Sequence, residues 1–197
     1  MRRQASISRK TEETQIDLSL DLDGTGRAEV STGIPFLDHM LASLAKHGRF
    51  NLELNAKGDL EVDPHHTVED VGIVLGQTFR KALGDKRGIV RFGGSLMVMD
   101  EALALVALDL SGRSRLEWDV EMPAEMIGTY DTGLTHEFMH AFVNHAALTL
   151  HVKTLAGGNT HHMIEAVFKG LARALEAATR QDPRMAEEVP STKGELE

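Results

Sequence analysis

The sequence predicts a two-layer α+β fold in which one β-β-α-β-α unit occurs twice. Residues 14–22 alternate polar and apolar side chains, as expected of a half-buried strand, and residues 36–44 carry apolar side chains at helical spacing. The second half repeats this order, and His145 follows His47 by 98 positions. Helices that cover one face of a sheet bury their apolar stripe in a two-layer arrangement, so we expect two such units related by a pseudo-two-fold axis.

The duplication also predicts the domain organisation. The 197 residues form a single domain of two repeats, at about 1–90 and 91–182, followed by a polar, proline-containing tail at 183–197. Apolar residues make up 42% of the chain, which is enough for a full hydrophobic core.

The composition argues against several classes of protein. The chain has no cysteine, which removes disulfides and zinc-thiolate sites and fits a reducing compartment. Its formal net charge of −9 is unusual for a protein that binds a nucleic acid duplex. Apolar runs are too short to span a bilayer, and no apolar signal region follows the basic start. We therefore expect a cytoplasmic protein that binds neither nucleic acid nor membranes.

Two His-His-x-x-Glu motifs lie at predicted helix starts. Asp63 and Pro64 precede His65, which gives an N-cap acceptor followed by proline at the first helical position. Asn159 takes the capping role before His161. The positive end of the helix dipole disfavours imidazolium by about 0.3–1 kcal/mol, and neutral imidazole is the form that ligates a metal.

The spacing within each motif predicts two metal sites. Residues i and i+4 lie one above the other on a helix face, whereas adjacent histidines point about 100° apart. Each helix therefore gives its i and i+4 residues to one metal and its i+1 histidine to the other. The pseudo-symmetry then predicts two ligand sets: His65, Glu69 and His162 for the first metal, and His161, Glu165 and His66 for the second.

Each set still needs a fourth ligand. His39, opposite the apolar stripe of its predicted helix, can supply one, and the 98-residue offset places Glu137 at the matching position. We predict Glu137 as a ligand of the first metal, with its neighbour His136 as the competing candidate. His47, two turns beyond His39, is a candidate to line the site. The other histidines are expected to be structural or to contact the ligands: His140, His145 and His151.

The ligand types suit several metals and several functions. Nitrogen and oxygen ligands without sulfur suit manganese, iron, cobalt, nickel or zinc. One candidate function is that of a dinuclear metallohydrolase, which would use a bridging water on a phosphorylated small molecule. Another is that of a metal-storage or scaffold protein, which would leave basic residues such as Arg91 and Lys193 without a role.

The chain resembles the imidazoleglycerol-phosphate dehydratases of histidine biosynthesis over nearly its whole length. The matching motifs are Phe36-Leu37-Asp38-His39-Met40, His65-His66-Thr67-Val68-Glu69-Asp70, Leu110-Ser111-Gly112-Arg113, Gly158-Asn159-Thr160-His161-His162 with Glu165, and Pro190-Ser191-Thr192-Lys193-Gly194. The resemblance implies a duplicated, ribosomal-S5-domain-2-like fold with two Mn²⁺ ions per active site. It also implies a homo-oligomer of 24 subunits built from trimers, with sites between subunits. One position departs from the usual pattern, because family members often carry a histidine where Glu137 stands.

The reaction implied is the loss of water from imidazoleglycerol phosphate to give imidazole acetol phosphate. The proton to be removed is not acidic, and the resemblance suggests a route through the imidazole ring. Two cations bound to the ring nitrogens favour imidazolate, whose electrons expel the neighbouring hydroxyl to give a diazafulvene. A base then takes the side-chain proton, and the resulting enol becomes the ketone.

The resemblance also implies roles for individual residues. Glu13 matches the substrate-contacting glutamate and is assigned as the general acid/base. Arg91, Arg115 and Lys193 match positions that hold the phosphate, although Arg113 competes equally with Arg115 on the residues alone. The expected substrate contacts are Glu13, His39, His47, His65, Glu69, Arg91, Arg115, Ser191 and Lys193.

One further acidic pair precedes a predicted strand. Asp100 and Glu101 are adjacent there, and we expect them to be structural.

Overall fold

The structure is a computed structural model and describes residues 3–186 and 188–196. The first half contains β1 (Gln4–Lys10), β2 (Thr14–Asp21), β3 (Ala28–Ser31), α1 (Pro35–Gly48), β4 (Asn51–Gly58) and α2 (His65–Leu83). The second half contains β5 (Phe92–Met99), β6 (Ala102–Asp109), β7 (Arg115–Asp119), β8 (Met126–Ile127), β9 (Tyr130–Asp131), α3 (Leu134–Ala146), β10 (Thr149–Ala156) and α4 (Thr160–Thr179). The helices of the described residues include none that is long and apolar enough to cross a membrane.

The two halves have the same sheet topology, which confirms the predicted duplication. The first sheet has the order β1-β2-β4-β3 and the second has the order β5-β6-β10-β7. In each sheet the last-named strand is parallel to its neighbour and the other pairs are antiparallel.

The four-stranded sheet of each unit has one strand more than the predicted β-β-α-β-α order. The additional strands, β3 and β7, precede the first helix of their unit and pair with the strand that follows it. They are short, at four and five residues, and parallel pairing becomes possible only once the intervening helix has crossed over. The hairpin of β8 and β9 has no counterpart among the described residues of the first half.

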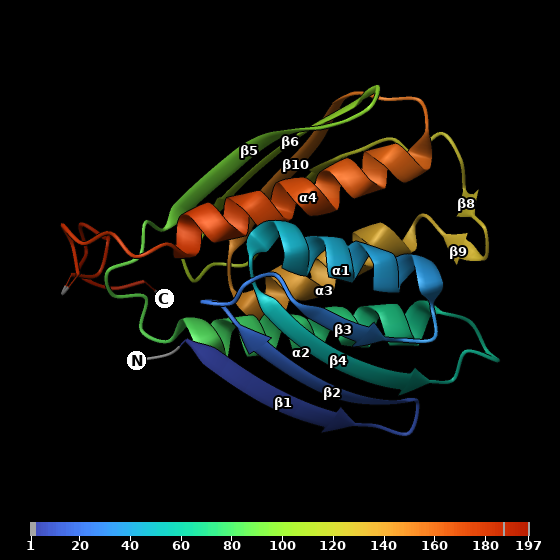
Figure 1. The fold of residues 1–197 in the computed structure, drawn as a ribbon, viewed down its shortest axis with the longest axis horizontal. Helices are drawn as coiled ribbons and strands as arrows, with labels where there is room; N and C mark the ends of the chain where they lie inside the picture. The colour runs from blue at the N-terminus through green and yellow to red at the C-terminus, as the bar shows by residue number, and fades with distance from the viewer. Residues whose placement is uncertain (1–2, 187, 197) are drawn as a thin grey trace.

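The four helices lie between the two sheets (Figure 1). Helix α2 covers β1 and β2, and α4 covers β5 and β6, so each half has the predicted two layers. The halves then meet helix against helix, with α1 packed on α4 and α2 packed on α3. All four helices begin at the same end of the molecule, and the chain termini lie at the opposite end (Figure 1).

The strands follow the alternation seen in the sequence. In β2, Ile16, Leu18 and Leu20 are buried beneath the helices, while Gln15 and Asp17 are exposed on the outer face. A strand with this period buries one face only, and the helix layer supplies the cover.

Two glycines allow α2 and α3 to approach closely. A Cβ atom at Gly72 would lie 2.8 Å from the carbonyl oxygen of Phe138, and one at Gly76 would lie 2.6 Å from that of Phe142. The two helices therefore contact through backbone at this crossing, and larger residues on α2 would separate them.

Replacing Gly76 with alanine should lower the free energy of unfolding by about 1–2 kcal/mol. The clash with α3 backbone outweighs the gain in helix propensity, which is roughly 1 kcal/mol. Urea denaturation of the metal-free protein measures the change. Gly94→Ala is the control, since a Cβ there meets only the Val106 carbonyl oxygen, at 3.6 Å. Equal stability of the two variants would contradict close helix contact as the reason for Gly76.

Candidate functional site

Both His-His pairs lie in the first turn of a helix, as the sequence predicts. The Asp63 carboxylate accepts a hydrogen bond from the His65 backbone N–H at 2.7 Å. The Asn159 side chain does the same for His161 at 3.0 Å. These caps satisfy backbone donors that the helix leaves unpaired, and they fix where each histidine pair begins.

Three predicted ligands come together between α1 and α4. One donor atom from each of His39, His161 and Glu165 lies within 4.8 Å of the others. Glu165 Oε2 is 3.3 Å from His161 Nε2 and 3.7 Å from His39 Nε2. Donor atoms at about 2.0–2.3 Å from one ion lie within about 4.6 Å of each other, so small movements would place a divalent cation here. Two imidazole nitrogens and a carboxylate oxygen fit Mn²⁺ and its neighbours in the first transition row.

A lysine that the sequence analysis missed pairs with this cluster. Lys169 Nζ lies 2.7 Å from Glu165 Oε1, one helical turn along α4. Burial acts to raise the pKa of Glu165, but the hydrogen bond from Lys169 and the nearby charges lower it. The i, i+4 spacing of the two residues was the available signal in the sequence.

The rest of the predicted ligand sets are not brought together within one chain. Among the described residues, only His39, His161 and Glu165 form a group of three or more close donors. Within one chain, His65, Glu69 and His162 therefore do not form such a group, and His66 does not join His161 and Glu165. The sets name ligands and not the copy of the chain that supplies them, so they remain predictions.

The i+1 histidine of each pair instead contacts a carboxylate. His66 Nδ1 lies 3.0 Å from Asp59 Oδ2, and His162 Nδ1 lies 2.8 Å from Glu101 Oε2. The hydrogen bond that His66 donates to Asp59 raises the pKa of His66, and the one that His162 donates to Glu101 raises the pKa of His162. The contact with His162 also lowers the pKa of Glu101 to about 2. Glu101, which we expected to be only structural, thus contacts a predicted ligand.

The second nitrogen of each of these histidines also faces an acid. Glu13 Oε1 lies 3.9 Å from His66 Nε2, so the predicted acid/base is next to a predicted ligand. Asp100 Oδ2 lies 3.8 Å from His162 Nε2.

The candidates on α3 form a separate group. Glu137 is half-buried and its Oε1 lies 3.3 Å from His136 Nδ1. The ring of His136 stacks on that of His140 and meets the edge of Trp118.

The other histidines differ in their surroundings. His47 lies toward α4, since its carbonyl accepts a hydrogen bond from Arg173. Desolvation lowers the pKa of His47, and the charge of Lys169 adds to the effect. His145 Nδ1 is bonded to the Ala141 carbonyl, whereas His151 is exposed on β10.

Basic residues gather at the opposite end of the molecule, where the C-terminal tail folds back. One hollow there is lined by Arg91, Arg113, Ser191, Thr192, Lys193, Glu195 and Leu196. Arg91 donates two hydrogen bonds to Asp109 and one to the Pro190 carbonyl, which holds the tail against β5. Arg115 does not line this hollow, and it pairs with Glu117 instead.

These two groups are too far apart for one small molecule to reach both. The Arg91 backbone N–H is bonded to Ala178 near the end of α4, while His161 lies at its start. The intervening 17 residues of helix span about 25 Å at 1.5 Å per residue.

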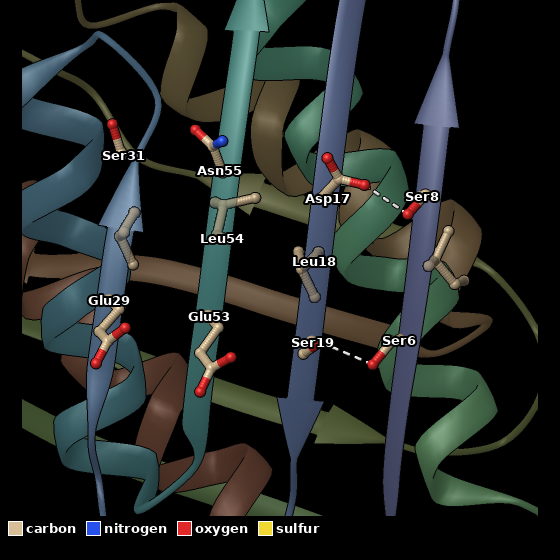
Figure 2. Close-up of a pocket in the computed structure, with 12 residues that line it drawn as sticks. Ser6, Ser8, Asp17, Leu18, Ser19, Glu29, Ser31, Glu53, Leu54 and Asn55 are labelled. Atoms are coloured by element: carbon tan, nitrogen blue, oxygen red, sulfur yellow. Dashed lines mark hydrogen bonds between the residues drawn. The ribbon is translucent and has the colours of Figure 1, made fainter.

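A further hollow lies on the outer face of the first sheet and holds none of the predicted site residues. Figure 2 shows its serine and acidic side chains, with Ser6 bonded to Ser19 and Ser8 bonded to Asp17 across the strands. These contacts satisfy the polar groups of a solvent-facing sheet.

Comparison with known proteins decides the family. The model of the imidazoleglycerol-phosphate dehydratase family matches residues 32–175, a range that includes all three clustered donors. The chain belongs to the imidazoleglycerol-phosphate dehydratase family. The imidazoleglycerol-phosphate dehydratase of Janthinobacterium sp. (strain Marseille) is 55% identical over 98% of both chains. That of Granulibacter bethesdensis is 56% identical over the full length of both.

Solved structures of imidazoleglycerol-phosphate dehydratases share the fold. The Staphylococcus aureus enzyme superposes with a TM-score of 0.83 at 39% identity, covering 91% of this chain and 99% of that one. The Pyrococcus furiosus structure, a complex with (S)-C348, gives 0.83 at 36% identity, with 96% and 100% covered. The predicted family, fold class and dehydratase activity are therefore confirmed.

One buried acid fixes the start of α2 in this dehydratase. Asp70 accepts a hydrogen bond from the Thr14 hydroxyl and pairs with Arg9, so it ties the helix that carries the first His-His pair to β1 and β2. The corresponding position 96 residues later is Ala166, so this anchor belongs to the first half alone.

Asp70→Ala should destabilise the protein by about 2–3 kcal/mol, as for other hydrogen bonds to charged groups. For a chain of this size that is a fall of roughly 4–12 °C in Tm, measured on the metal-free protein. Asp85→Ala, at an exposed loop carboxylate, should change Tm little. An unchanged Tm for Asp70→Ala would show that the anchor contributes nothing.

Proposed function

We propose that this dehydratase removes water from imidazoleglycerol phosphate with the help of two Mn²⁺ ions in each active site. The reaction gives imidazole acetol phosphate and belongs to histidine biosynthesis. The two-metal proposal rests on the close approach of the side chains of His39, His161 and Glu165 in a member of this family. Cytoplasmic location remains a prediction from the cysteine-free composition.

The residues that would hold the metals are those predicted from the duplicated motifs. They are His39, His65, His66, Glu69, Glu137, His161, His162 and Glu165, with His136 as the alternative to Glu137. When bound, the two cations supply Lewis acidity at the two ring nitrogens of the substrate and lower the pKa of the ring. His39 and His161 present Nε2 toward Glu165, which supports their role as donors to one ion.

We further propose that each active site is assembled from more than one copy of the chain. Two observations support this. The His65 and His161 motifs do not combine within one chain, and the basic hollow lies about 25 Å along α4 from the histidines. A single ring with a phosphorylated three-carbon chain is much shorter than that. A second copy must bring the missing groups, in keeping with a homo-oligomer of 24 subunits built from trimers.

Glu13 would move the proton. Its carboxylate oxygen lies 3.9 Å from Nε2 of His66, one of the proposed metal ligands. Glu13 takes the proton from the carbon that bears the second hydroxyl, after the hydroxyl next to the ring has left and the substrate has become a diazafulvene. The departing hydroxyl and one proton make the water, and the enol that remains becomes the ketone.

The phosphate would be held by the basic hollow. Arg91, Arg113 and Lys193 supply cationic donors, and Ser191 adds a hydroxyl. The position of Arg113 in this hollow favours it over the predicted Arg115. The family assignment also favours a dehydratase over a dinuclear metallohydrolase. Incubating the metal-loaded protein with phosphomonoesters would test the hydrolase alternative directly.

Removing metal from the purified enzyme with a chelator should abolish dehydration, and adding Mn²⁺ should restore it. Glu165→Ala should lose at least one Mn²⁺ per chain together with activity, because it removes the only oxygen donor of the cluster.

Glu13→Gln should keep both ions and lose turnover by about 100-fold or more, as expected for a general acid/base. Metal analysis and an assay on imidazoleglycerol phosphate measure these effects. Full activity of the metal-free enzyme would refute the metal proposal, and normal turnover of Glu13→Gln would remove Glu13 from the reaction.

Arg113→Ala should raise KM for the substrate by roughly 10- to 100-fold, since a charge-assisted bond to phosphate is lost. Arg115→Ala is the matched control and should stay close to the unchanged enzyme. Competition by inorganic phosphate gives a second measure, because it should weaken in Arg113→Ala alone. The opposite ranking of the two variants would restore Arg115 as the phosphate ligand.

A further inference from the structure

The i+1 histidines of the two motifs are held in the same way at Nδ1. Asp59 contacts His66 at 3.0 Å and Glu101 contacts His162 at 2.8 Å. An ionised carboxylate can only accept hydrogen bonds, so each imidazole donates from Nδ1. A neutral imidazole that donates from Nδ1 has its lone pair at Nε2, which is then available to a cation.

The duplication does not account for this shared contact. Asp59 follows β4, and the residue at the matching place after β10, 98 positions later, is Gly157. Glu101 lies in the turn between β5 and β6, and the corresponding turn between β1 and β2 carries Glu13. Glu13 faces the other nitrogen of its histidine, at 3.9 Å from His66 Nε2. The two halves therefore reach the same contact from positions that are not equivalent, which indicates a requirement of the histidines themselves.

We propose that Asp59 and Glu101 are positioning residues that orient His66 and His162 and hold each with Nε2 free to bind a divalent cation. This inference rests on the proposed function, because it assumes that both histidines are metal ligands. Carboxylates in this role typically change metal affinity by 10- to 100-fold when they are removed.

The two carboxylates differ in what else they do. Glu101 also accepts the backbone N–H groups of Gly158 and Asn159, so it helps to hold the loop before α4. Asp59 has a simpler environment: its Oδ1 is buried and makes no hydrogen bond within the described residues. A buried carboxylate oxygen without a partner is costly, so a purely structural role for Asp59 is poorly supported. Asp59 therefore gives the cleaner test.

The test compares Asp59→Ala, Asp59→Asn and Glu101→Ala in the full-length, assembled protein. Mn²⁺ affinity is measured by calorimetric titration, and the tautomers of the imidazoles by ¹⁵N solid-state spectra of histidine-labelled, metal-free protein. Asp119→Ala is the control, because this exposed carboxylate pairs with the exposed side chain of Lys153 on the second sheet.

Asp59→Ala should weaken one class of Mn²⁺ site by 10- to 100-fold and shift one histidine away from the Nδ1–H form. Asp59→Asn should recover much of both, since its amide oxygen still accepts from Nδ1–H. Glu101→Ala should weaken binding by a similar factor, with an additional loss of thermal stability from the freed loop.

Wild-type Mn²⁺ affinity and unchanged spectra in both alanine variants would overturn the proposal. If the parent protein itself binds no Mn²⁺, the two-metal function fails instead. The spectra of the metal-free variants then still decide whether the carboxylates set the tautomer.

Discussion

The contact between the helix layers of the two halves determines where the chemistry lies. Each half buries its sheet under helices, but the helices still need cover, and they find it in the other half: α1 against α4 and α2 against α3. Both pairs run in the same direction, as the approach of Phe36 to His161 and of His47 to Arg173 shows for α1 and α4. All four helices therefore begin at one end of the molecule (Figure 1). Each His-His pair lies in the first turn of its helix, although the two pairs share no donor group within one chain.

Two electrostatic effects oppose each other at that end. Helix N-termini disfavour imidazolium, by about 0.3–1 kcal/mol each. Carboxylates favour it, and the hydrogen bonds that His66 and His162 donate to Asp59 and Glu101 raise the pKa of each histidine. The same carboxylates make the end of the molecule attractive to cations. A divalent ion that replaces the protons would satisfy both the neutral imidazoles and the surrounding acids.

The separation of acidic and basic groups gives the molecule two complementary ends. Histidines and carboxylates occupy the helix starts, whereas Arg91, Arg113 and Lys193 lie near the end of α4 and the tail. A phosphorylated imidazole needs both kinds of group at once, and α4 is too long for one chain to offer them. Under the proposed function, oligomerisation would complete the active site, and activity would then depend on assembly.

The sequence alone determined the repeated unit, the capped helix starts and the types of ligand, because local periodicity and capping chemistry depend on neighbouring residues. Three of the predicted ligands, His39, His161 and Glu165, do lie close together in the structure. Only the tertiary structure showed that β3 and β7 pair beyond their helices, and that Arg113 lines the basic hollow while Arg115 does not. Contacts such as Asp59 with His66 and Glu101 with His162 join separate elements, so no sequence period encodes them. They depend on how the loops are placed once both sheets and all four helices have packed.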